Sequence, residues 1–339
     1  MLKRPETDNR NKTRNIIMLV IAAVIVIAAV AAISIMENRK SEPVTDSGRD
    51  VYNIEGVECT KKQNVETYLI MGTDRNDSPE DKLTRADTVI LLAIDRKNET
   101  YSLLPLDRDA MVTYEITDKE GEVLGEASTQ LALAYTAGRD DEEGCEITEK
   151  AVSKLMGGQF INGYAAINMD SIGKINNILG GVDVTIEDDF GAGSDFVVGQ
   201  QVHLNDEQAE EFVRGRKGVG DGTNENRMKR QQAYLDGAIN AFKDKTLEDS
   251  SFVDNAMNEL KDCMVTDMTN AQFTKIGKIL EGNSRIEVPE IKYTRTINEQ
   301  SKLAEVVYDE TTLNYAIISL FYKPVEEWYF KSLLEEAAE

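Results

Sequence analysis

One long uncharged segment near the N-terminus constrains this chain more than any other feature. Ile16 to Met36 is a run of 21 residues in which Ser34 is the only polar side chain. A helix of that length is about 30 Å long, which matches the hydrocarbon core of a bilayer. A cleaved signal peptide is the alternative, because Ala28 to Ala32 offers small residues, but its apolar region is usually about 7–15 residues long. The run therefore predicts one uncleaved transmembrane anchor.

The charges that flank this anchor predict its orientation. Five basic side chains precede it against two acidic ones, whereas Arg39 and Lys40 after it lie among acidic residues. The five are Lys3, Arg4, Arg10, Lys12 and Arg14. The positive-inside rule then puts residues 1–15 in the cytoplasm as a short tail and everything after residue 36 outside. We therefore expect a single-pass type II protein of the cell membrane.

The part beyond the anchor divides by composition. Residues 37–62 are polar and contain Pro43, Ser47 and Gly48, which is typical of a linker. Residues 63–325 carry the patterns of a folded domain, and residues 326–339 are interpreted as a C-terminal tail. The chain has 61 acidic and 38 basic residues, for a net charge of −23. A surface this acidic excludes nucleic acid as a partner, since such binding needs clustered basic side chains.

Three cysteines, Cys59, Cys145 and Cys263, are too few for a disulfide framework. A single pair can still oxidise outside the cytoplasm. Cys59 lies close to the membrane in the sequence, so we expect any disulfide to join Cys145 and Cys263. Their spacing matches no metal-site pattern.

The folded part reads as an α/β domain. Val65 to Met71 and Thr88 to Ile94 are short apolar runs, and Tyr101 to Leu106 resembles them, which favours strands covered on both faces. Further strands are expected at Tyr164–Asn168, Val182–Ile186, Ile286–Val288, Lys292–Thr296 and Leu303–Tyr308, and helices at Ser128–Ala137, Thr148–Met156, Ser171–Leu179, Asp206–Arg214, Asn226–Phe242 and Thr311–Phe321. Strands at both ends of the sequence, with helices between, favour one α/β unit over two domains.

Acidic residues mark two expected strand ends. Asp74 follows the first apolar run, and Asp87 directly precedes the second. Two carboxylates that flank one loop, completed by phosphate oxygens, suit Mg²⁺. Capping of a turn is an equally good explanation of the spacing alone. The triplet Asp107-Arg108-Asp109 follows the third run, and a surface ion pair explains it as well as a site does.

A basic cluster in this acidic chain favours a binding site over these structural explanations. Between residues 214 and 230, six basic side chains face only two acidic ones: Arg214, Arg216, Lys217, Arg227, Lys229 and Arg230 against Asp221 and Glu225. Arg227 and Arg230 are three apart on an expected helix that Thr223 or Asn224 can cap, so they project near its positive end. One guanidinium group can bind two phosphate oxygens at once, through two parallel N–H···O hydrogen bonds. A solvated basic face is the alternative, but it explains the intervening glycines poorly, so an oxyanion site is favoured.

Six short motifs occur together in one order. They are Gly72-Thr73-Asp74, Arg85-Ala86-Asp87-Thr88, Asp107-Arg108-Asp109, Gly180-Gly181-Val182-Asp183-Val184, Phe212-Val213-Arg214-Gly215-Arg216 and Asn226-Arg227-Met228-Lys229-Arg230-Gln231-Gln232. Each is weak alone, but in this order behind a type II anchor they resemble the LytR-CpsA-Psr family, from about Val65 to Tyr322. The resemblance implies an α/β sandwich with a central mixed sheet and a hydrophobic tunnel for a lipid tail.

The resemblance also implies an activity. It is that of a phosphotransferase of bacterial cell-wall assembly, which moves a glycopolymer such as teichoic acid or a capsular-type polysaccharide. The donor is an undecaprenyl-pyrophosphate carrier and the acceptor a peptidoglycan sugar hydroxyl; hydrolysis of polyprenyl pyrophosphate is the implied side activity. Asp74 and Asp87 match the family's magnesium ligands. Arg85, Arg108, Arg214, Arg216, Arg227 and Gln231 match its pyrophosphate-binding positions, with Arg230 as a supporter. Arg85, Asp87, Arg108 and Asp109 are the expected catalytic residues.

Some assignments stay open at this point. The base that takes the acceptor proton is Asp109 or Asp87. Many family members have Pro at Asp107 and a Lys-Leu-Asn-His-Ala-Tyr run at Gln130 to Tyr135, and these departures bear on acceptor and polymer more than on the reaction. A non-catalytic binder of lipid-linked polymer is the alternative function. Transcription attenuation ranks last, because a cytoplasmic part of about 15 residues holds no DNA-reading domain. His203 is expected to be structural.

Overall fold

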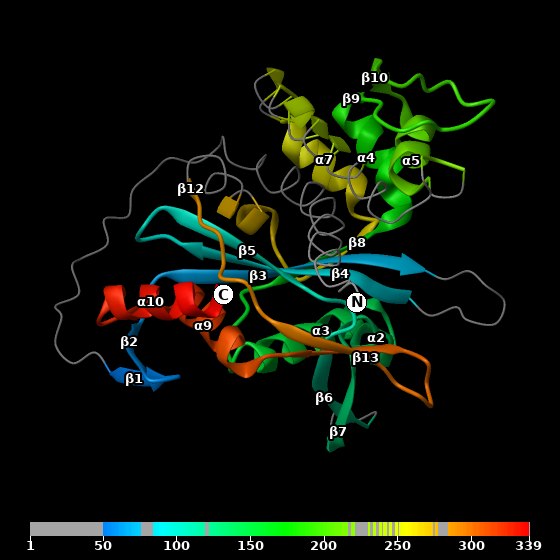
Figure 1. The fold of residues 1–339 in the computed structure, drawn as a ribbon. Coiled ribbons are helices and arrows are strands. Elements are labelled where there is room, and N and C mark those ends of the chain that lie inside the picture. The colour runs from blue at the N-terminus through cyan, green and yellow to red at the C-terminus, as the bar shows by residue number, and fades with distance from the viewer. Residues whose placement is uncertain are drawn as a thin grey trace, which may run out of the picture. The chain divides into compact units, whose positions relative to one another are not determined.

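The computed structural model describes residues 50–75, 84–118, 122–215 and 218–220, parts of 230–276, and residues 284–338. Within them, the contacts group into two compact units. The first unit holds Ile70–Ile90 and Ala165–Glu281, and the second holds the described residues up to Leu69, Leu91–Tyr164 and Gly282–Glu339. The strands β3 and β4 contribute residues to both units (Figure 1).

A six-stranded sheet in the order β11-β8-β3-β4-β5-β12 forms the centre of the fold. Its strands are β3 (Val65–Arg75), β4 (Thr84–Asp95), β5 (Thr100–Leu106), β8 (Tyr164–Asn168), β11 (Met264–Thr266) and β12 (Ser284–Arg285). The sheet is mixed, because β11 runs antiparallel to β8 and β12 parallel to β5. Every residue from Thr88 to Asp95 is buried, so β4 is covered on both faces as predicted.

Two strands of the six-stranded sheet are unusually long. β3 has 11 residues and β4 has 12, about twice the usual strand length. The expectation of a single α/β domain stays a prediction. The apolar runs recognised in the sequence cover only part of these long strands.

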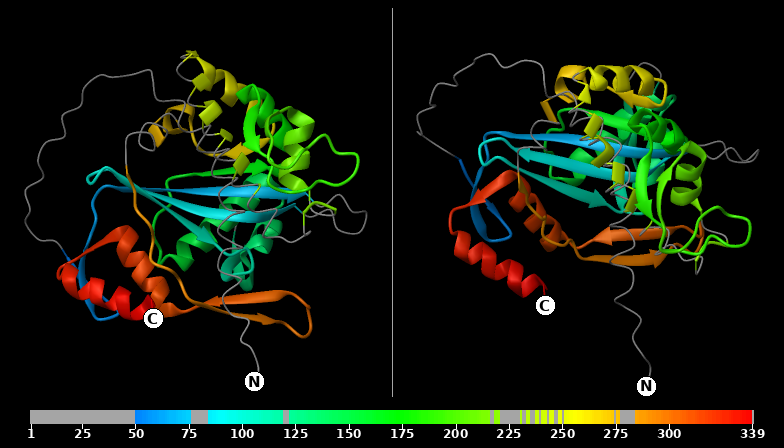
Figure 2. Two further views of the ribbon diagram at one scale, coloured as in Figure 1. Left: turned by 45° about the horizontal axis from the view of Figure 1, so that its top comes forward. Right: turned by 90° about the horizontal axis from the view of Figure 1, so that it is seen from above.

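The first unit adds helices and a small hairpin to its part of the sheet. Its elements are η3 (Met169–Ser171), α4 (Ile172–Leu179), β9 (Val182–Thr185), β10 (Gln201–Leu204), α5 (Asp206–Arg214) and α7 (Phe252–Leu260). α4 packs against α5 and α7, and these helices lie together in both views of Figure 2. A capping box between Asn205 and Gln208 starts α5, and Gly180 with φ of 77° ends α4.

The second unit is built from hairpins and helices. Its elements include β6 (Met111–Thr117), β7 (Val123–Gln130), α2 (Leu131–Ala134), η2 (Tyr135–Ala137), α3 (Asp141–Leu155), β13 (Tyr293–Ile297), β14 (Ala304–Tyr308) and α9 (Glu310–Phe321). β6 pairs with β7, and β13 with β14, both antiparallel. Asp140 and Asp309 cap α3 and α9 by accepting hydrogen bonds from backbone N–H groups of the first turn.

Two expected unstructured segments are folded in the second unit. β1 (Val51–Ile54) and β2 (Val57–Lys61) form a hairpin that pairs with β15 (Tyr322–Pro324), so the linker prediction is wrong for these residues. Glu55 and Gly56, both with positive φ, make its turn, and Val57 and Cys59 are buried. The expected C-terminal tail holds α10 (Glu327–Ala338), whose Phe330 packs edge-on against Tyr315.

Other expectations need correction. The helix predicted to begin at Ser128 starts only at Leu131, because Ser128, Thr129 and Gln130 pair with β6. Ile286–Val288 is not a strand; β12 ends at Arg285. The expected disulfide is wrong as well: none of the three cysteines, all in described segments, forms one. Cys145 Sγ instead lies 3.8 Å from Tyr135 Oη, and Cys263 Sγ lies 3.6 Å from Lys174 Nζ.

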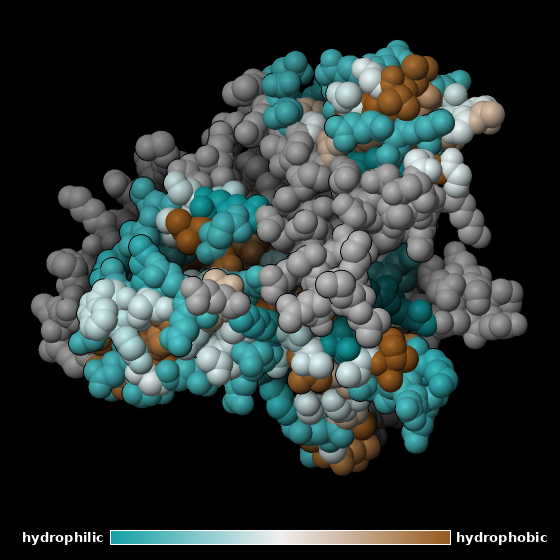
Figure 3. Space-filling model, in the orientation of Figure 1, coloured by the Kyte–Doolittle hydropathy of each residue, from teal (hydrophilic) through white to brown (hydrophobic). Residues whose placement is uncertain are grey.

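The described surface in Figure 3 is mainly hydrophilic, as the acidic composition requires. Apolar side chains gather at the tip of the β6–β7 hairpin, where Ile116, Val123 and Leu124 are exposed. Among the described residues, no helix is long and apolar enough to span a bilayer. The predicted anchor at residues 16–36 lies outside them, so it stays a prediction.

Candidate functional site

The triplet Asp107-Arg108-Asp109 forms a tight turn between β5 and β6. Asp107 makes it, because its Oδ1 accepts a hydrogen bond from the Asp109 N–H at 2.9 Å, and its carbonyl accepts one from the Ala110 N–H at 2.9 Å. This is the turn chemistry expected of an aspartate. The carbonyls of Arg108 and Asp109 accept from the backbone N–H groups of Ala132 and Val306, both at 2.9 Å. The turn is therefore held by α2 and β14.

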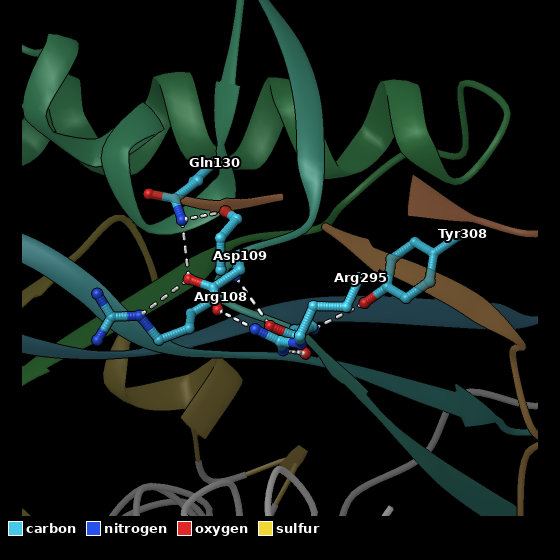
Figure 4. Close-up of polar contacts among 7 residues, drawn as sticks. Arg108, Asp109, Gln130, Arg295 and Tyr308 are labelled. Carbon is cyan, nitrogen blue, oxygen red and sulfur yellow. Dashed lines mark hydrogen bonds and ion pairs between the residues drawn. The ribbon is translucent and has the colours of Figure 1, made fainter. Parts of the chain in front are cut away.

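Arg295 on β13 bridges the two carboxylates of this turn (Figure 4). Its Nη2 lies 2.6 Å from Asp107 Oδ2, and its Nη1 lies 2.6 Å from Asp109 Oδ2. Burial alone would lower the pKa of Arg295, but the hydrogen bond to Asp109 and the charges of both aspartates outweigh it and raise the pKa. Arg295 is thus a fixed cation.

Gln130 and Tyr308 complete this network. Gln130 Nε2 donates to Asp109 Oδ1 at 2.9 Å and to the Ala304 carbonyl at 2.6 Å. Tyr308 Oη accepts a hydrogen bond from the Asp107 N–H at 2.7 Å, and burial raises the pKa of this tyrosine. Both carboxylates of the turn are therefore engaged from elements distant in the sequence.

Arg108 lies on the opposite side of Asp109 from Arg295, and a dashed line in Figure 4 joins it to Asp109. Its side chain is 40% exposed, and its Nε lies 3.7 Å from Asp109 Oδ1. Asp107, by contrast, is only 7% exposed at its side chain. The arrangement thus presents one exposed guanidinium on a rigid turn. Guanidinium groups on such a support suit bidentate binding of a phosphate.

Asp74, Arg85 and Asp87 lie on neighbouring strands of the first unit. Asp74 is the penultimate residue of β3, and Arg85 and Asp87 are near the start of β4. Only eight residues, 76–83, connect these adjacent strands, too few for a crossover, so the pair is a hairpin and its two acids belong to the same end. All three side chains are half-buried.

The donor set at this hairpin fits a magnesium ion. Magnesium takes hard oxygen ligands and is usually bound through one or two carboxylates plus substrate phosphates and water. Asp74 and Asp87 meet that requirement. In the described residues, no cluster of three or more acidic, cysteine or histidine side chains forms a complete protein cage for a metal.

The two described arginines of the basic cluster have different surroundings. Arg214, at the end of α5, pairs with Asp170 and is 47% exposed. Arg230 is 3% exposed: it pairs with Asp188, donates to the carbonyls of Phe212 and Gly215, and lies over the ring of Phe190. Direct phosphate contact, which the sequence suggested, is not available to Arg230 in this conformation. It stabilises the loop that follows α5.

Several expected residues lie outside the described part. Arg216, Arg227 and Gln231 are among them, so their roles stay predictions. His203 is described and is structural as expected. Its Nδ1 lies 2.9 Å from Asp183 Oδ1 and its Nε2 lies 2.9 Å from the Gly180 carbonyl.

Comparison with known proteins places the chain in a family. The model of the LytR_cpsA_psr family matches residues 25–316. The chain belongs to the LytR_cpsA_psr family. One family relative, the polyisoprenyl-teichoic acid–peptidoglycan teichoic acid transferase TagU of Bacillus mycoides (strain KBAB4), is 26% identical over 71% of this chain and 74% of its own length. The TagU of Enterococcus faecalis (strain ATCC 700802 / V583) is 26% identical over 66% of this chain and 70% of its own.

Solved structures of family proteins share the fold. The crystal structure of Bacillus subtilis TagV covers 76% of this chain and 96% of that chain, with a TM-score of 0.51 and 21% identity. Protein gbs0355 of Streptococcus agalactiae covers 80% and 95%, with a TM-score of 0.52 and 19% identity. The LytR_cpsA_psr fold, with its central mixed sheet, is therefore the fold of this chain.

The sequence did not reveal three members of the network. Arg295, Gln130 and Tyr308 lie in segments that match none of the six motifs. Gln130 was noted only as a departure from the family pattern. The one available signal was the pair of acids that flank Arg108, since two carboxylates so close need a cation.

Proposed function

We propose that this chain transfers a phosphate-linked glycopolymer from a polyprenyl-pyrophosphate carrier to a hydroxyl of a peptidoglycan sugar. Membership of the LytR_cpsA_psr family and the transferase names of its relatives support transfer to peptidoglycan. The observation that carries the chemistry is the exposed Arg108 on its rigid turn. An exposed cation on a rigid support suits the stabilisation of a pyrophosphate.

In this proposal the acceptor oxygen attacks the phosphorus that carries the polymer. The bond from that phosphorus to the bridging oxygen breaks, and polyprenyl phosphate leaves. Arg108 binds the diphosphate and stabilises the charge that grows on it, with Arg85, Arg214, Arg216, Arg227 and Gln231 as further contacts. Positioning and charge neutralisation supply most of the catalysis in such transfers.

Asp74 and Asp87 would hold Mg²⁺ at the β3–β4 hairpin. Bound there, it would neutralise the phosphate oxygens during transfer. The acceptor proton goes to a carboxylate, Asp87 or Asp109. Asp109 already accepts from Arg295 and Gln130 through its two oxygens, which leaves it fewer lone pairs for an incoming hydroxyl.

The location follows from the donor. A polyprenyl carrier stays in the bilayer, so a type II anchor at residues 16–36 would keep the folded part at the membrane surface where the pyrophosphate is exposed.

Turnover distinguishes this transferase from a binder. The full chain in detergent, given a polyprenyl pyrophosphate and Mg²⁺, should release polyprenyl phosphate, and EDTA should stop it. Arg108→Ala should lower the rate at least about 100-fold, the scale of a lost charge-stabilising group. Arg96→Ala is the matched control, because Arg96 is exposed and pairs with Glu66. Stable binding without turnover would identify a binder, and full activity of Arg108→Ala would overturn the role of that residue.

A further inference from the structure

Apolar and aromatic side chains are exposed together where α10 follows the small sheet of the second unit. Val325 directly precedes this helix, and Trp328 and Tyr329 lie in its first turn. All three are exposed, Trp328 to 70%. The rings of Trp328 and Tyr329 lie edge-to-face, with centroids 5.9 Å apart. Single exposed apolar residues are ordinary, but a group of them with two aromatic rings marks a surface that binds something.

The sheet order β1-β2-β15 fixes this aromatic cluster beside the first strand of the described chain. The Val325 N–H donates to the Glu58 carbonyl at 2.8 Å, and Glu58 on β2 pairs with Asn53 on β1. The ring of Tyr52, also on β1, lies edge-on to that of Tyr322 on β15, with centroids 5.6 Å apart. The β1–β2 hairpin and α10 accordingly lie together in both views of Figure 2.

The length of chain before β1 limits the distance from this cluster to the bilayer. Only residues 37–50 separate the predicted anchor from β1. That stretch spans at most about 50 Å when fully extended. If residues 16–36 cross the membrane, the hairpin and the cluster beside it belong to the part of the second unit that is tethered most closely to the bilayer. A surface held so near meets the lipid at high effective concentration, so a few contacts suffice.

The chemistry of the cluster suits the boundary between lipid headgroups and acyl chains. Trp and Tyr combine an apolar ring with a polar N–H or O–H group and gather at that boundary in membrane proteins. From Lys323 to Lys331 the two basic side chains are balanced by Glu326 and Glu327, and Lys323 Nζ lies 3.6 Å from Glu327 Oε1. Burial of apolar surface, rather than attraction to anionic lipid, would therefore drive the contact.

We propose that Val325, Trp328 and Tyr329 dock on the lipid bilayer that the predicted anchor spans. This inference rests on the location given under the proposed function. The cluster is then a second attachment to the membrane besides the anchor. It restricts how the second unit turns about its tether, and so keeps that unit at the surface where a polyprenyl donor exposes its diphosphate.

A single tryptophan makes the docking directly measurable. Trp328 is the one tryptophan of the chain, so all tryptophan fluorescence reports on this cluster. The full chain is incorporated into nanodiscs of phosphatidylcholine, either plain or brominated on the acyl chains. Because rings at the boundary contact the upper acyl chains, brominated lipid should reduce the emission of Trp328 at least about twofold. The reduction should be the same at low and high salt, since apolar contact is not screened.

Substitutions that keep the tryptophan test the surface itself. Val325→Asp places a charge within the cluster and should abolish most of the quenching by brominated lipid. Val307→Asp is the matched control, because Val307 is an equally exposed valine of the same unit, on β14. It should be quenched as wild type is. Tyr329→Asp gives the same comparison as Val325→Asp if the first variant fails to fold.

The outcomes separate the docking from the proposed function. If the chain enters nanodiscs but its emission is the same in plain and brominated lipid, the docking is wrong and the anchor stands. If the chain does not enter nanodiscs, the anchor is wrong and the docking fails with it, while turnover in detergent still tests the reaction. Protection of Trp328 that follows the number of chains per disc, and not the bromine, would identify a second copy as the occupant and overturn the docking on lipid.

Discussion

Arg108 and Arg230 show how differently two arginines of one chain are used. Arg108 is exposed on a turn whose carboxylates are held by Arg295. Arg230 is buried, and its guanidinium is engaged by Asp188 and by backbone carbonyls. Both belong to short motifs that suggested phosphate binding. The surroundings of each side chain, which come from distant segments, make one guanidinium exposed and the other buried.

Arg230→Met should therefore affect stability. Removal of one partner from a buried ion pair leaves Asp188 uncompensated and costs about 3–5 kcal/mol. Urea unfolding of the full chain measures this. Arg214→Met is the control, because its pair with Asp170 is about half exposed and should contribute less than about 1 kcal/mol. Equal, small losses for the two variants would contradict the structural role of Arg230.

At the scale of elements, the connection from α4 to β9 depends on a glycine. Gly181 has φ of +99°, and a Cβ there would lie 2.1 Å from His203 Nε2. Gly181→Ala should thus combine backbone strain with displacement of His203, at a cost of about 1–3 kcal/mol or more. Gly193→Ala isolates the strain, because Gly193 has φ of +104° and no atom near the added methyl group. The melting temperature of each variant measures this cost. If Gly181→Ala and Gly193→Ala lower it equally, the clash with His203 contributes nothing.

The same connection predicts a pH dependence. The hydrogen bond to Asp183 raises the pKa of His203 above its ordinary value. Because the folded pKa is the higher one, the stabilisation is complete below about pH 6.5, the ordinary value, and is lost as pH rises through the folded pKa. The free energy of unfolding of wild type should therefore fall relative to His203→Gln across this window. If the free energies of unfolding of wild type and His203→Gln change with pH in parallel, this prediction is wrong.

Elements with strong local signals could be predicted from the sequence. The apolar residues of β3 and β4, and the capping residues of α5, identify those elements directly. The β1–β2 hairpin was missed, because its short polar strands are stabilised by pairing with β15, more than 250 residues later in the chain. The Arg295 network escaped for the same reason, since it joins residues 186 and 188 apart. The order of the motifs identified Arg108 as a candidate site residue, but long-range contacts determine the conformation of its turn.

At the scale of the whole molecule, the anchor and the folded part should act together. If residues 16–36 span the membrane, a chain freed from them meets its lipid-bound donor only by diffusion. Release of residues 50–339 from the anchor should then reduce transfer in cells far more than turnover in detergent. Wall-polymer content of cells and rates with the purified proteins provide the two measurements. If transfer in cells and turnover in detergent fall equally, the anchor is needed for an active fold and not for access to the donor.

Transfer itself tests the central claim most directly. The full chain in detergent, with a polyprenyl-pyrophosphate-linked glycopolymer, peptidoglycan fragments and Mg²⁺, is analysed by mass spectrometry for a phosphodiester between polymer and sugar. Wild type should form this bond, Arg96→Ala should form it equally, and Arg108→Ala should form at least about 100-fold less. If wild type cleaves the carrier but forms no phosphodiester with peptidoglycan, the proposed transfer is wrong. If Arg108→Ala cleaves the carrier as fast as wild type does, the assignment to this site is wrong as well.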